Sequence, residues 1–540
     1  MNCTSGSENE ASSPSARRNV ARAAGAVTVA TAISRILGVA REMVMAKYFG
    51  AGYYTDAFNI AYRIPNLFRD LFAEGALSSA FIPTFVRGLH QEGREAAWAL
   101  ANRVITALLV LLGLVTLIFF VFAKGFVFLL AAGYADTPGK MELTTQMTRI
   151  MSPFLLCVAL AAVVMGMLNA SGSFFVPAVA PSAFNVCCIL AGIFLSPFMS
   201  AFGMEPVVSM AFGALFGGAS QFIVQVPSAC RIGWRFRLSL DLRDPGLRRI
   251  AKLMLPALIG LSATQINITV DSQLASQYGN GPVSWLNYAF RLMQLPIGLF
   301  GVAIATATAA AVSHHAAAGA FEKLSHTVHS SLRLAACLTF PATVGLLVLR
   351  EPIVCLLYER GSFLAEDTIQ TSKVLALYSL ALFAYSAVKI LVPAFYALGD
   401  TRTPVRSSII TVAIKIAVNF VLITRMGFLG LALATAMASW VNFALLLRQM
   451  DRAVPGGSWR KDIGAYARIG AASALMGLAA VMVFKGSDSW LPGAGTLHLA
   501  ICLGTAITLG GTVYLPLLGL FRVAEARELT DIVRRKILPR

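Results

Sequence analysis

The chain has 540 residues, of which 57% are hydrophobic and only 13% are charged, and its mean hydropathy is +0.71. Soluble globular proteins carry about 25% charged residues. The composition therefore excludes a soluble enzyme, a nucleic-acid-binding domain and a disordered protein, although 44 Lys and Arg against 26 acids give a net charge of +18. The eight cysteines form no C-x-x-C pair and lie mostly in apolar runs, so we expect core residues and not disulfides or metal ligands.

The apolar residues are grouped into long stretches. Residues 1–20 are polar and contain no apolar run, which predicts a disordered tail and not a cleavable signal peptide. Beyond them, apolar stretches follow one another, each long enough to cross a hydrocarbon layer ~30 Å thick as a helix. The sequence predicts an all-α polytopic membrane protein with about 14 transmembrane helices. The expected spans are residues 22–46, 57–86, 104–123, 148–169, 177–197, 206–230, 253–277, 284–313, 332–349, 374–398, 406–424, 427–447, 465–484 and 497–520.

An internal repeat is visible at an offset of about 228 residues. Because this offset covers six predicted helices, an even number, the two copies have the same orientation in the membrane. We therefore expect two six-helix lobes related by a parallel repeat, as in transporters with a central cavity, plus two C-terminal helices. The matching pairs are F-G-A-G (49–52) with Y-G-N-G (278–281), N-I-A-Y-R-I (59–64) with N-Y-A-F-R-L (287–292), and A-S-G-S-F-F-V-P (170–177) with A-L-G-D-T-R-T-P (397–404).

Basic residues concentrate in the loops of one side. By the positive-inside rule, this bias predicts that both termini are cytoplasmic. A lipid-headgroup or partner site in the central loop is an alternative to topology alone. The two largest clusters are Arg231, Arg235, Arg237, Arg243, Arg248, Arg249 and Lys252, and then Arg522, Arg527, Arg534, Arg535, Lys536 and Arg540.

The predicted helices and loops give six segments. They are a disordered cytoplasmic tail (1–20), an N-lobe with helices 1–6 (21–231), a basic cytoplasmic linker (232–252), a C-lobe with helices 7–12 (253–448), helices 13–14 (449–521) and a basic cytoplasmic tail (522–540).

Charged residues also lie within the first two predicted helices, in S-R-I-L-G-V-A-R-E (34–42) and in residues 55–75. A charge at membrane depth costs about 2.5–3.5 kcal/mol on insertion scales. It remains only where it faces a wet cavity, pairs with another charge or acts on a ligand. Asp56, Arg63 and Asp70 are seven residues apart, which places them on one face of a helix.

Arginines outnumber acids among these intramembrane charges. A guanidinium binds phosphate through a planar fork of two parallel hydrogen bonds, so phosphate or pyrophosphate is the best-matched ligand. For Arg63, which corresponds to Arg291 in the repeat, and for Asp70 and Glu74, ion pairing between helices is an equally consistent interpretation. The candidate anion site contains Arg35, Arg41, Arg69 and Arg291.

Other motifs narrow the class. The sequence contains no G-x-x-x-x-G-K-[ST], no H-E-x-x-H and no D-D pair, so nothing indicates ATP hydrolysis or metal-assisted phosphoryl chemistry. Four histidines follow the eighth predicted helix, at a spacing that could suit a metal, but a solvated cytoplasmic loop is the expected setting. They are His314, His315, His326 and His329.

Asp271 lies in the middle of the seventh predicted helix without a basic neighbour one turn away. A carboxylate there must be protonated, paired or bound to a cation. Lys389 or Lys415 could pair with it. The alternative is a Na⁺ site with Asp271 as the anionic ligand and Asn419 and Thr435 as neutral oxygen donors. No other cofactor is expected.

Several of these segments resemble the MurJ (MviN) family of lipid II flippases, which belongs to the multidrug/oligosaccharidyl-lipid/polysaccharide exporter superfamily. The resemblance covers nearly all of the chain after the tail. It implies a bacterial inner-membrane protein of fourteen helices, in which helices 13–14 form a groove for a lipid tail. The segments are S-R-I-L-G-V-A-R-E, T-D-A-F-N-I-A-Y-R-I-P-N-L-F-R, L-F-A-E-G-A-L-S-S-A-F-I-P, V-S-W-L-N-Y-A-F-R-L-M-Q-L-P and V-K-I-L-V-P-A-F-Y-A-L-G-D-T-R-T-P.

The resemblance also carries over individual residues. It implies substrate binding by Arg35, Arg41, Arg69, Arg291, Asp56, Ser34 and Glu74. The chain departs from the family pattern at Glu42, where Asp is usual, at Arg63, where Lys is usual, and at Asp70, where a basic residue is usual. Asp70 excludes a basic role at that position, and the main cationic set is intact.

The resemblance implies that the substrate is lipid II, the undecaprenyl-pyrophosphate-linked precursor of peptidoglycan. We therefore expect a flippase for cell-wall biogenesis and cell shape that works by alternating access and is not an enzyme. The alternatives are a flippase for another polyprenyl-linked saccharide, a drug exporter of the same superfamily and a polyprenyl-phosphate transferase. A cation exporter should have an acid-rich cavity, and a transferase needs an acidic metal-binding cluster. The expected partners are lipid II and membrane lipids, without nucleic acid, and binding to cell-wall synthesis proteins is left open.

Overall fold

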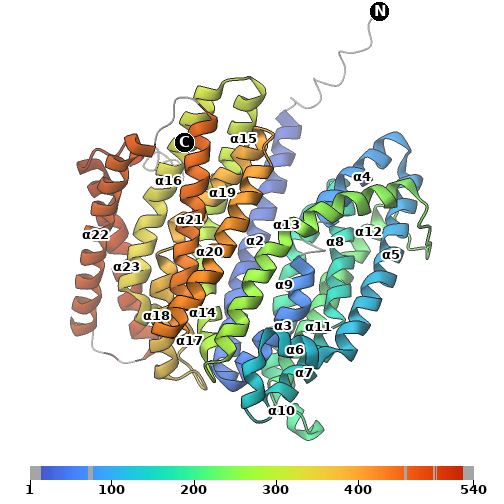
Figure 1. Ribbon diagram of the computed structural model, residues 1–540, viewed down its shortest axis with the longest axis horizontal. Helices are drawn as coiled ribbons and strands as arrows, with labels where there is room; N and C mark the ends of the chain where they lie inside the picture. The colour runs from blue at the N-terminus through green and yellow to red at the C-terminus, as the bar shows by residue number, and fades with distance from the viewer. Residues whose placement is uncertain (1–13, 71–76, 455–458, 491–492, 494, 527–540) are drawn as a thin grey trace, which may run out of the picture. The chain divides into compact units, whose positions relative to one another are not determined.

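The chain folds into helices throughout its described part, in two compact units (Figure 1). The computed structural model describes residues 14–70, 77–454, 459–490, 493 and 495–526, without the side chains of 14–28, 78–79, 256–264 and 461. The units are Met1–Asn280 and Gly281–Arg540. No strand occurs in the described residues, which confirms the all-α prediction.

The first unit contains twelve labelled α-helices in its described part. They are α2 (Pro14–Phe49), α3 (Tyr53–Arg69), α4 (Ser78–Gln91), α5 (Arg94–Val121), α6 (Ala123–Leu130), α7 (Lys140–Met151), α8 (Phe154–Ala170), α9 (Phe175–Leu190), α10 (Ser196–Met199), α11 (Val208–Ile223), α12 (Val226–Arg231) and α13 (Pro245–Ser276).

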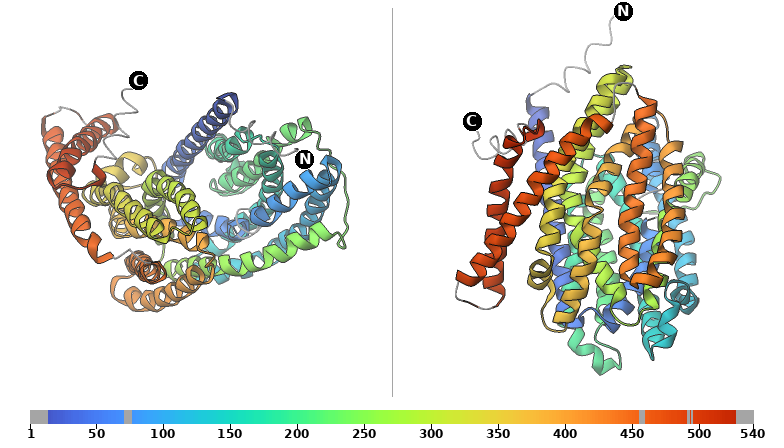
Figure 2. Two further views of the ribbon diagram at one scale, coloured as in Figure 1. Left: turned by 90° about the horizontal axis from the view of Figure 1, so that it is seen from above. Right: turned by 60° about the vertical axis from the view of Figure 1, so that its left-hand side comes forward.

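The second unit contains the remaining described helices. They are α14 (Pro282–Pro296), α15 (Val302–Ala317), α16 (Phe321–Val348), α17 (Arg350–Tyr358), α18 (Ala365–Ser379), α19 (Leu382–Ala397), α20 (Arg402–Met426), α21 (Leu429–Ala453), α22 (Trp459–Trp490) and α23 (Thr496–Leu520). Both views of Figure 2 show α22 and α23 side by side on one flank of this unit.

The helices match the predicted membrane spans. Ten helices of the described chain are long and apolar enough to cross a membrane, and the pair α18 and α19, bent by 42°, makes an eleventh. The other three predicted spans, 22–46, 57–86 and 253–277, are also helical in their described parts, within α2, α3 with α4, and α13. Residues 71–76 of the second of these spans lie outside the description, as do the side chains of 22–28 and 256–264 in the other two, so these spans are supported by their helical backbone.

The structure shifts two of the predicted segment boundaries, because helices extend into the predicted tail and linker. The helix α2 begins at Pro14, so residues 14–20 of the predicted tail are helical, and residues 1–13 lie outside the description. The predicted linker 232–252 likewise becomes helical at Pro245, where the Asp244 side chain accepts a hydrogen bond from the Leu247 N–H. Of the predicted C-terminal tail, residues 527–540 are not described.

The predicted C-lobe begins at residue 253, whereas the compact units divide at Asn280 and Gly281. The helix α13, which covers the seventh predicted span, packs against α4, α5 and α6 of the first unit. The predicted lobes are defined by the duplicated sequence, whereas the compact units are defined by contacts between residues. The predicted lobe boundaries therefore stay a prediction.

The sequence repeat is also present in the backbone. Gly50 and Gly279, which precede α3 and α14, have φ angles of 68° and 79°. Gly172 and Gly399, which follow α8 and α19, have φ angles of 80° and 76°. Glycine takes this left-handed conformation without the strain that a Cβ would cause. The paired motifs therefore form the same kind of turn in both copies of the repeat.

Each unit has its own buried core. The core of the first joins α2, α3, α7, α8, α9 and α11, and it includes Met45, Ala57, Met147, Phe154 and Phe184. The core of the second joins α15, α16, α19, α21, α22 and α23. Since lipid tails are as apolar as these side chains, close packing and not hydrophobic transfer holds such helices together.

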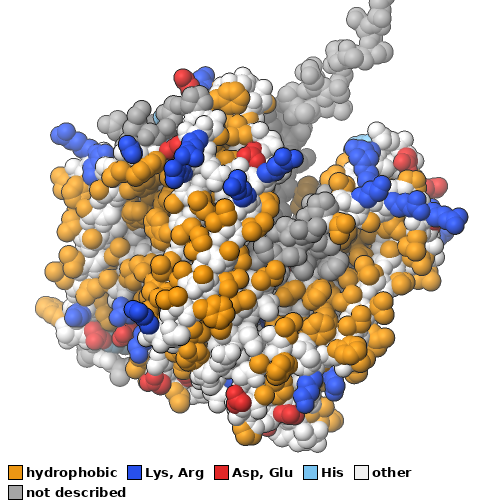
Figure 3. Space-filling view, in the orientation of Figure 1, with side chains coloured by type: hydrophobic (Ala, Val, Ile, Leu, Met, Phe, Trp, Pro, Cys, Tyr) orange, Lys and Arg blue, Asp and Glu red, His pale blue; other side chains and the backbone are white. Residues whose placement is uncertain are grey.

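The outer faces of the helices are apolar. On α5, Val110, Leu114, Leu117 and Val121 recur every three or four residues and are each 55–57% exposed. This spacing places them on one face of the helix. Figure 3 shows hydrophobic side chains over the flanks of the helices, with Lys and Arg gathered near their ends. Such a surface suits contact with lipid.

Candidate functional site

Arg41 is held within the first unit between a carboxylate and an aromatic ring. Its Nη2 atom donates a 2.6 Å hydrogen bond to Oε1 of Glu42, and the two side chains are 13% and 12% exposed. Its Cζ atom lies 5.3 Å from the ring centroid of Phe184 on α9. An ion pair and a cation–π contact together fix the guanidinium on α2.

A second contact joins α2 and α9, about two turns of α2 before Arg41. The Nδ2 atom of Asn185 on α9 donates to the Ser34 carbonyl oxygen at 3.1 Å. Ser34 is half-buried, and the neighbouring Arg35 side chain is exposed. The predicted residues of α2 are therefore positioned by α9, with Arg35 projecting from the packed surface.

Arg69 and Asp70 form an ion pair at the end of α3. The Nη2 and Nε atoms of Arg69 donate to Oδ1 of Asp70 at 2.8 and 3.3 Å. The side chains are 23% and 30% exposed. Asp70 is thus an acceptor for Arg69. Arg63 is half-buried on the same helix, and Glu74 lies outside the described residues.

Asp56 is buried in an ion pair that no local sequence pattern indicates. Its Oδ2 atom lies 3.0 Å from Nζ of Lys140 on α7, and neither side chain is exposed. The Nζ atom also donates to Oδ1 of Asn280 at 2.8 Å and lies 4.1 Å from the ring centroid of Tyr134. In this structure Asp56 joins α3 to α7, and its role in substrate binding stays a prediction.

The apolar run predicts that the fourth span begins at residue 148, which leaves Lys140 outside the predicted helix. The helix in fact starts at Lys140, directly after the left-handed Gly139. The signal in the sequence was the P-G-K turn, since a glycine of this kind often ends one segment immediately before the next begins.

Arg291 lies on α14 of the second unit. It is half-buried, and its Nε atom donates to Oδ1 of Asn287 at 3.1 Å. These two residues are one helical turn apart. Asn287 corresponds to Asn59 in the repeat, as Arg291 corresponds to Arg63.

The three residues of the expected Na⁺ site lie on three helices. Asp271 is half-buried on α13 of the first unit, and Asn419 and Thr435 are buried on α20 and α21 of the second. The Thr435 hydroxyl donates to the Leu431 carbonyl oxygen at 2.8 Å. Ion coordination by these three stays a prediction.

Among the described residues, one group of side chains is close enough together to bind a metal ion, and it includes none of the three residues of the expected Na⁺ site. It consists of Asp488 on α22 with His498 and Cys502 on α23. The Sγ atom of Cys502 lies 3.5 Å from Nε2 of His498.

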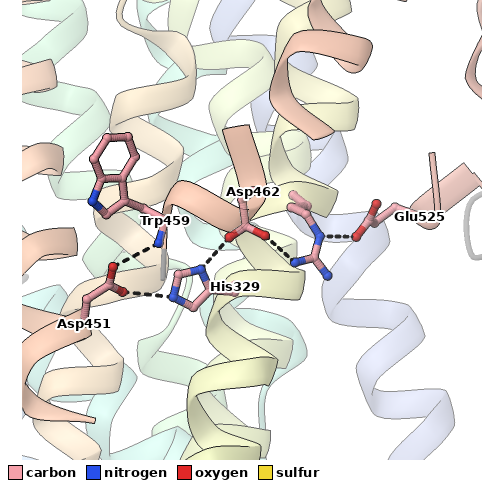
Figure 4. Close-up of polar contacts among 6 residues, drawn as sticks. His329, Asp451, Trp459, Asp462 and Glu525 are labelled. Carbon is pink, nitrogen blue, oxygen red and sulfur yellow. Dashed lines mark hydrogen bonds and ion pairs between the residues drawn. The ribbon is translucent and has the colours of Figure 1, made fainter. Parts of the chain in front are cut away.

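His329 corrects the expectation that all four histidines belong to a solvated loop. It lies on α16 and is 5% exposed, because α16 begins at Phe321 and carries His329 into the core. Its Nδ1 and Nε2 atoms lie 2.6 and 3.0 Å from carboxylate oxygens of Asp462 and Asp451 (Figure 4). His314, at the end of α15, and His326 are exposed, as expected.

An apolar groove runs along the same unit. It has a volume of about 640 Å³ and lies between α16, α19, α21 and α22. Its walls include Phe340, Phe383, Met437, Trp440 and Gly470. Apart from Thr343 and Ser473, the side chains that line it are apolar or absent, which suits a hydrocarbon ligand.

The sequence matches a family model over most of its length. Residues 45–500 match the model described as "Lipid II flippase MurJ". The chain belongs to this family.

Individual relatives agree with the family model. The "Probable lipid II flippase MurJ" of Vibrio cholerae is 36% identical over 505 residues, which are 92% of this chain and 95% of that protein. The "Lipid II flippase MurJ" of Burkholderia cenocepacia is 34% identical over 467 residues, which are 85% and 89% of the two chains.

Solved structures give the same result. One titled "Lipid II flippase MurJ, inward closed conformation" superposes with a TM-score of 0.76 and 27% identity, over 93% of this chain and 99% of that chain. An inward-facing multidrug MATE transporter of the MOP superfamily has a TM-score of 0.64 at 14% identity, over 78% and 95% of the chains. The MATE likeness shows the fold alone.

Membership in the MurJ family makes this chain a multi-pass inner-membrane protein of a flippase family. Arg69 and Arg291 lie within the matched residues, whereas Arg35 and Arg41 lie before them. Glu525, in the described segment after α23, lies beyond them.

Proposed function

We propose that this chain moves lipid II from the inner to the outer leaflet of the bacterial inner membrane by alternating access. Relatives that are 34–36% identical over most of both chains carry the name lipid II flippase. The proposed site binds the pyrophosphate through Arg35, Arg41, Arg69 and Arg291, and Ser34, Glu42, Asp56, Arg63 and Glu74 contribute to it. No covalent bond changes, so the chain acts as a transporter and not as an enzyme.

The geometry of Arg41 is the observation that best supports binding of the pyrophosphate headgroup. A guanidinium has five N–H donors, and Glu42 binds one terminal nitrogen, Nη2, at 2.6 Å. The Phe184 ring supports the cation without adding a carboxylate. Further donors of the fork can therefore bind phosphate oxygens, which prefer such planar, paired donors.

The groove of the second unit supports the proposal for the lipid tail. Its apolar walls and volume of about 640 Å³ suit part of a prenyl chain. Because α22 forms one wall, the tail would lie along the first of the two C-terminal helices. In this proposal the tail remains in an apolar environment while the headgroup crosses.

The direction of transport requires an energy source. The basic clusters support a cytoplasmic position for both termini, by the positive-inside rule. We propose Na⁺ as the coupling ion, with Asp271 as the anionic ligand and Asn419 and Thr435 as neutral donors, since hard cations prefer oxygen ligands. Lipid II and membrane lipids are the proposed partners.

Replacement of the native flippase in depleted bacterial cells tests the proposal. Cells that express this chain should resume growth, and lipid II should become accessible to an impermeant probe at the outer leaflet. An Arg41→Ala variant at equal membrane abundance should restore neither. If the wild-type chain is inserted at normal abundance and lipid II stays in the inner leaflet, the proposal is refuted.

A further inference from the structure

A buried polar cluster joins three helices of the second unit at His329. Asp451 lies at the end of α21 and Asp462 at the beginning of α22, and His329 of α16 lies between them (Figure 4). His329 is 5% exposed and Asp462 is 6% exposed. A single side chain of α16 thus contacts both neighbouring helices.

The geometry favours a doubly protonated ring. Nδ1 faces Oδ2 of Asp462 at 2.6 Å, and Nε2 faces Oδ1 of Asp451 at 3.0 Å. An ionised carboxylate only accepts hydrogen bonds, and a neutral imidazole donates from one nitrogen only. An imidazolium donates to both carboxylates at once.

The surrounding charges also favour a cationic ring. Arg333 of α16 donates to Oδ1 of Asp462 at 2.7 Å and to Glu525 of the segment after α23. Three carboxylates therefore surround one guanidinium and the ring. Without a charge on His329, two buried carboxylates and the half-buried Asp451 would face one guanidinium among the described contacts, and uncompensated buried charge is costly.

Further contacts extend the cluster over the start of α22. The second carboxylate oxygen of Asp451 accepts a hydrogen bond from the Trp459 N–H at 3.0 Å (Figure 4). Arg468 donates to the carbonyl oxygens of Phe521 and Arg522 at 3.3 and 3.2 Å. Tyr466 of α22 lies within electrostatic reach of both aspartates, Arg333 and Glu525. The cluster therefore fixes α22 on α16, on α21 and on the segment after α23.

The face of α22 that carries Asp462 continues along the apolar groove. Tyr466, Gly470 and Ser473 follow Asp462 at steps of three or four residues, which places all four on one face of the helix. Gly470 and Ser473 line the groove. The Tyr466 ring lies 6.4 and 5.7 Å from the ring centroids of two other groove residues, Phe340 and Phe383.

We propose that His329 is a positioning residue that, in its doubly protonated form, holds α22 closed along the apolar groove. The residues His329, Arg333, Asp451, Asp462 and Glu525 form this clasp. When the ring loses a proton, one of its two carboxylates loses its donor and the clasp loosens. That the groove holds a prenyl tail rests on the proposed function, whereas the clasp is a property of the chain alone.

Hydrogen exchange measured by mass spectrometry on the full chain in lipid nanodiscs tests the clasp. The readout is the exchange rate of residues 459–473, compared between variants at one pH so that intrinsic chemistry cancels. His329→Gln cannot carry a charge, and His329→Arg stays charged and can donate to both aspartates. His326→Gln is the matched control, because His326 is an exposed histidine one turn away on α16.

At about pH 6, where an unperturbed histidine is mostly charged, the His329→Gln variant should exchange about tenfold faster than the wild type in residues 459–473. The Arg variant and the His326→Gln control should match the wild type. As the pH is raised, the exchange of the wild type should rise above that of the Arg variant, because an imidazolium can lose its proton and a guanidinium cannot.

Two results would overturn the proposal. In the first, His329→Gln and the wild type exchange alike at about pH 6. In the second, the wild type and the Arg variant exchange alike at every pH at which the chain stays folded, which would exclude a clasp that depends on the ring proton. If the Gln variant does not fold, the second comparison still decides. Because the measurement uses no lipid II, failure of the clasp and failure of the proposed function are distinguishable.

Discussion

Removing Lys140 should strongly destabilise the first unit. The Asp56 and Lys140 side chains are both 0% exposed, and Lys140→Met removes hydrogen bonds of 3.0 and 2.8 Å to Asp56 and Asn280. It leaves Asp56 as an uncompensated buried carboxylate. Breaking a buried ion pair in this way costs about 3–5 kcal/mol of unfolding free energy. We expect Lys140→Met near the upper end of this range.

Replacing Asp56 should lower the free energy of unfolding less than replacing Lys140 does. Asp56→Asn keeps an oxygen acceptor near Lys140, and Lys140 retains Asn280, so we expect a loss near the lower end, about 3 kcal/mol. In the double variant neither charge is buried alone, so it should be more stable than Lys140→Met, since apolar or neutral replacements of a whole buried pair are often nearly neutral.

Thermal unfolding in one fixed detergent, followed by intrinsic fluorescence, checks this order. Lys124→Met is the matched control, because Lys124 is exposed on α6 and should change stability by about 0.5 kcal/mol or less. Two results would contradict a stabilising role for the buried ion pair. In the first, Lys140→Met and the wild type have the same unfolding temperature. In the second, the double variant has the lowest unfolding temperature of all.

Three further changes have expected outcomes. Arg41→Lys should slow lipid II transport about 10- to 100-fold at equal abundance, because a point charge cannot replace the fork; a full transport rate would contradict this. Asp271→Asn should remove the dependence of transport on Na⁺ or on membrane potential, and a wild type that ignores both would refute the ion site. Gly217→Ala should cost about 1–3 kcal/mol of stability, because an added Cβ would lie 2.6 Å from Cδ2 of Phe184. Gly113→Ala, with no atom within 4 Å of such a Cβ, should cost nothing; equal unfolding temperatures for both variants would contradict the packing argument.

The helical fold could be predicted because its signal is local. Each span is a run of apolar residues, and the repeat is anchored by glycines such as Gly50 and Gly279, whose left-handed turns recur at nearly the same offset. The helix ends were less predictable. Lys140 and residues 14–20 extend helices beyond the apolar runs, because a helix continues wherever its backbone is satisfied and not only where it is apolar.

The site residues could be predicted by type but not by partner. Arg41 and Arg69 stood out as charges within apolar segments, but their ion pairs with Glu42 and Asp70 depend on side-chain conformations that sequence spacing does not determine. His329 and Asp462 are 133 residues apart, and no local pattern joins them. Contacts of this kind follow from which helices pack together, which a single sequence does not reveal.

The most direct test of the central claim is lipid II transport by the purified chain in proteoliposomes. Lipid II that reaches the opposite leaflet is counted by an impermeant enzyme that modifies its headgroup. We predict transport by the wild type and by Arg87→Ala, an exposed basic residue of α4, but not by Arg41→Ala or Arg291→Ala. A wild-type chain that leaves lipid II in its original leaflet, or alanine variants that transport it at the wild-type rate, would contradict the account.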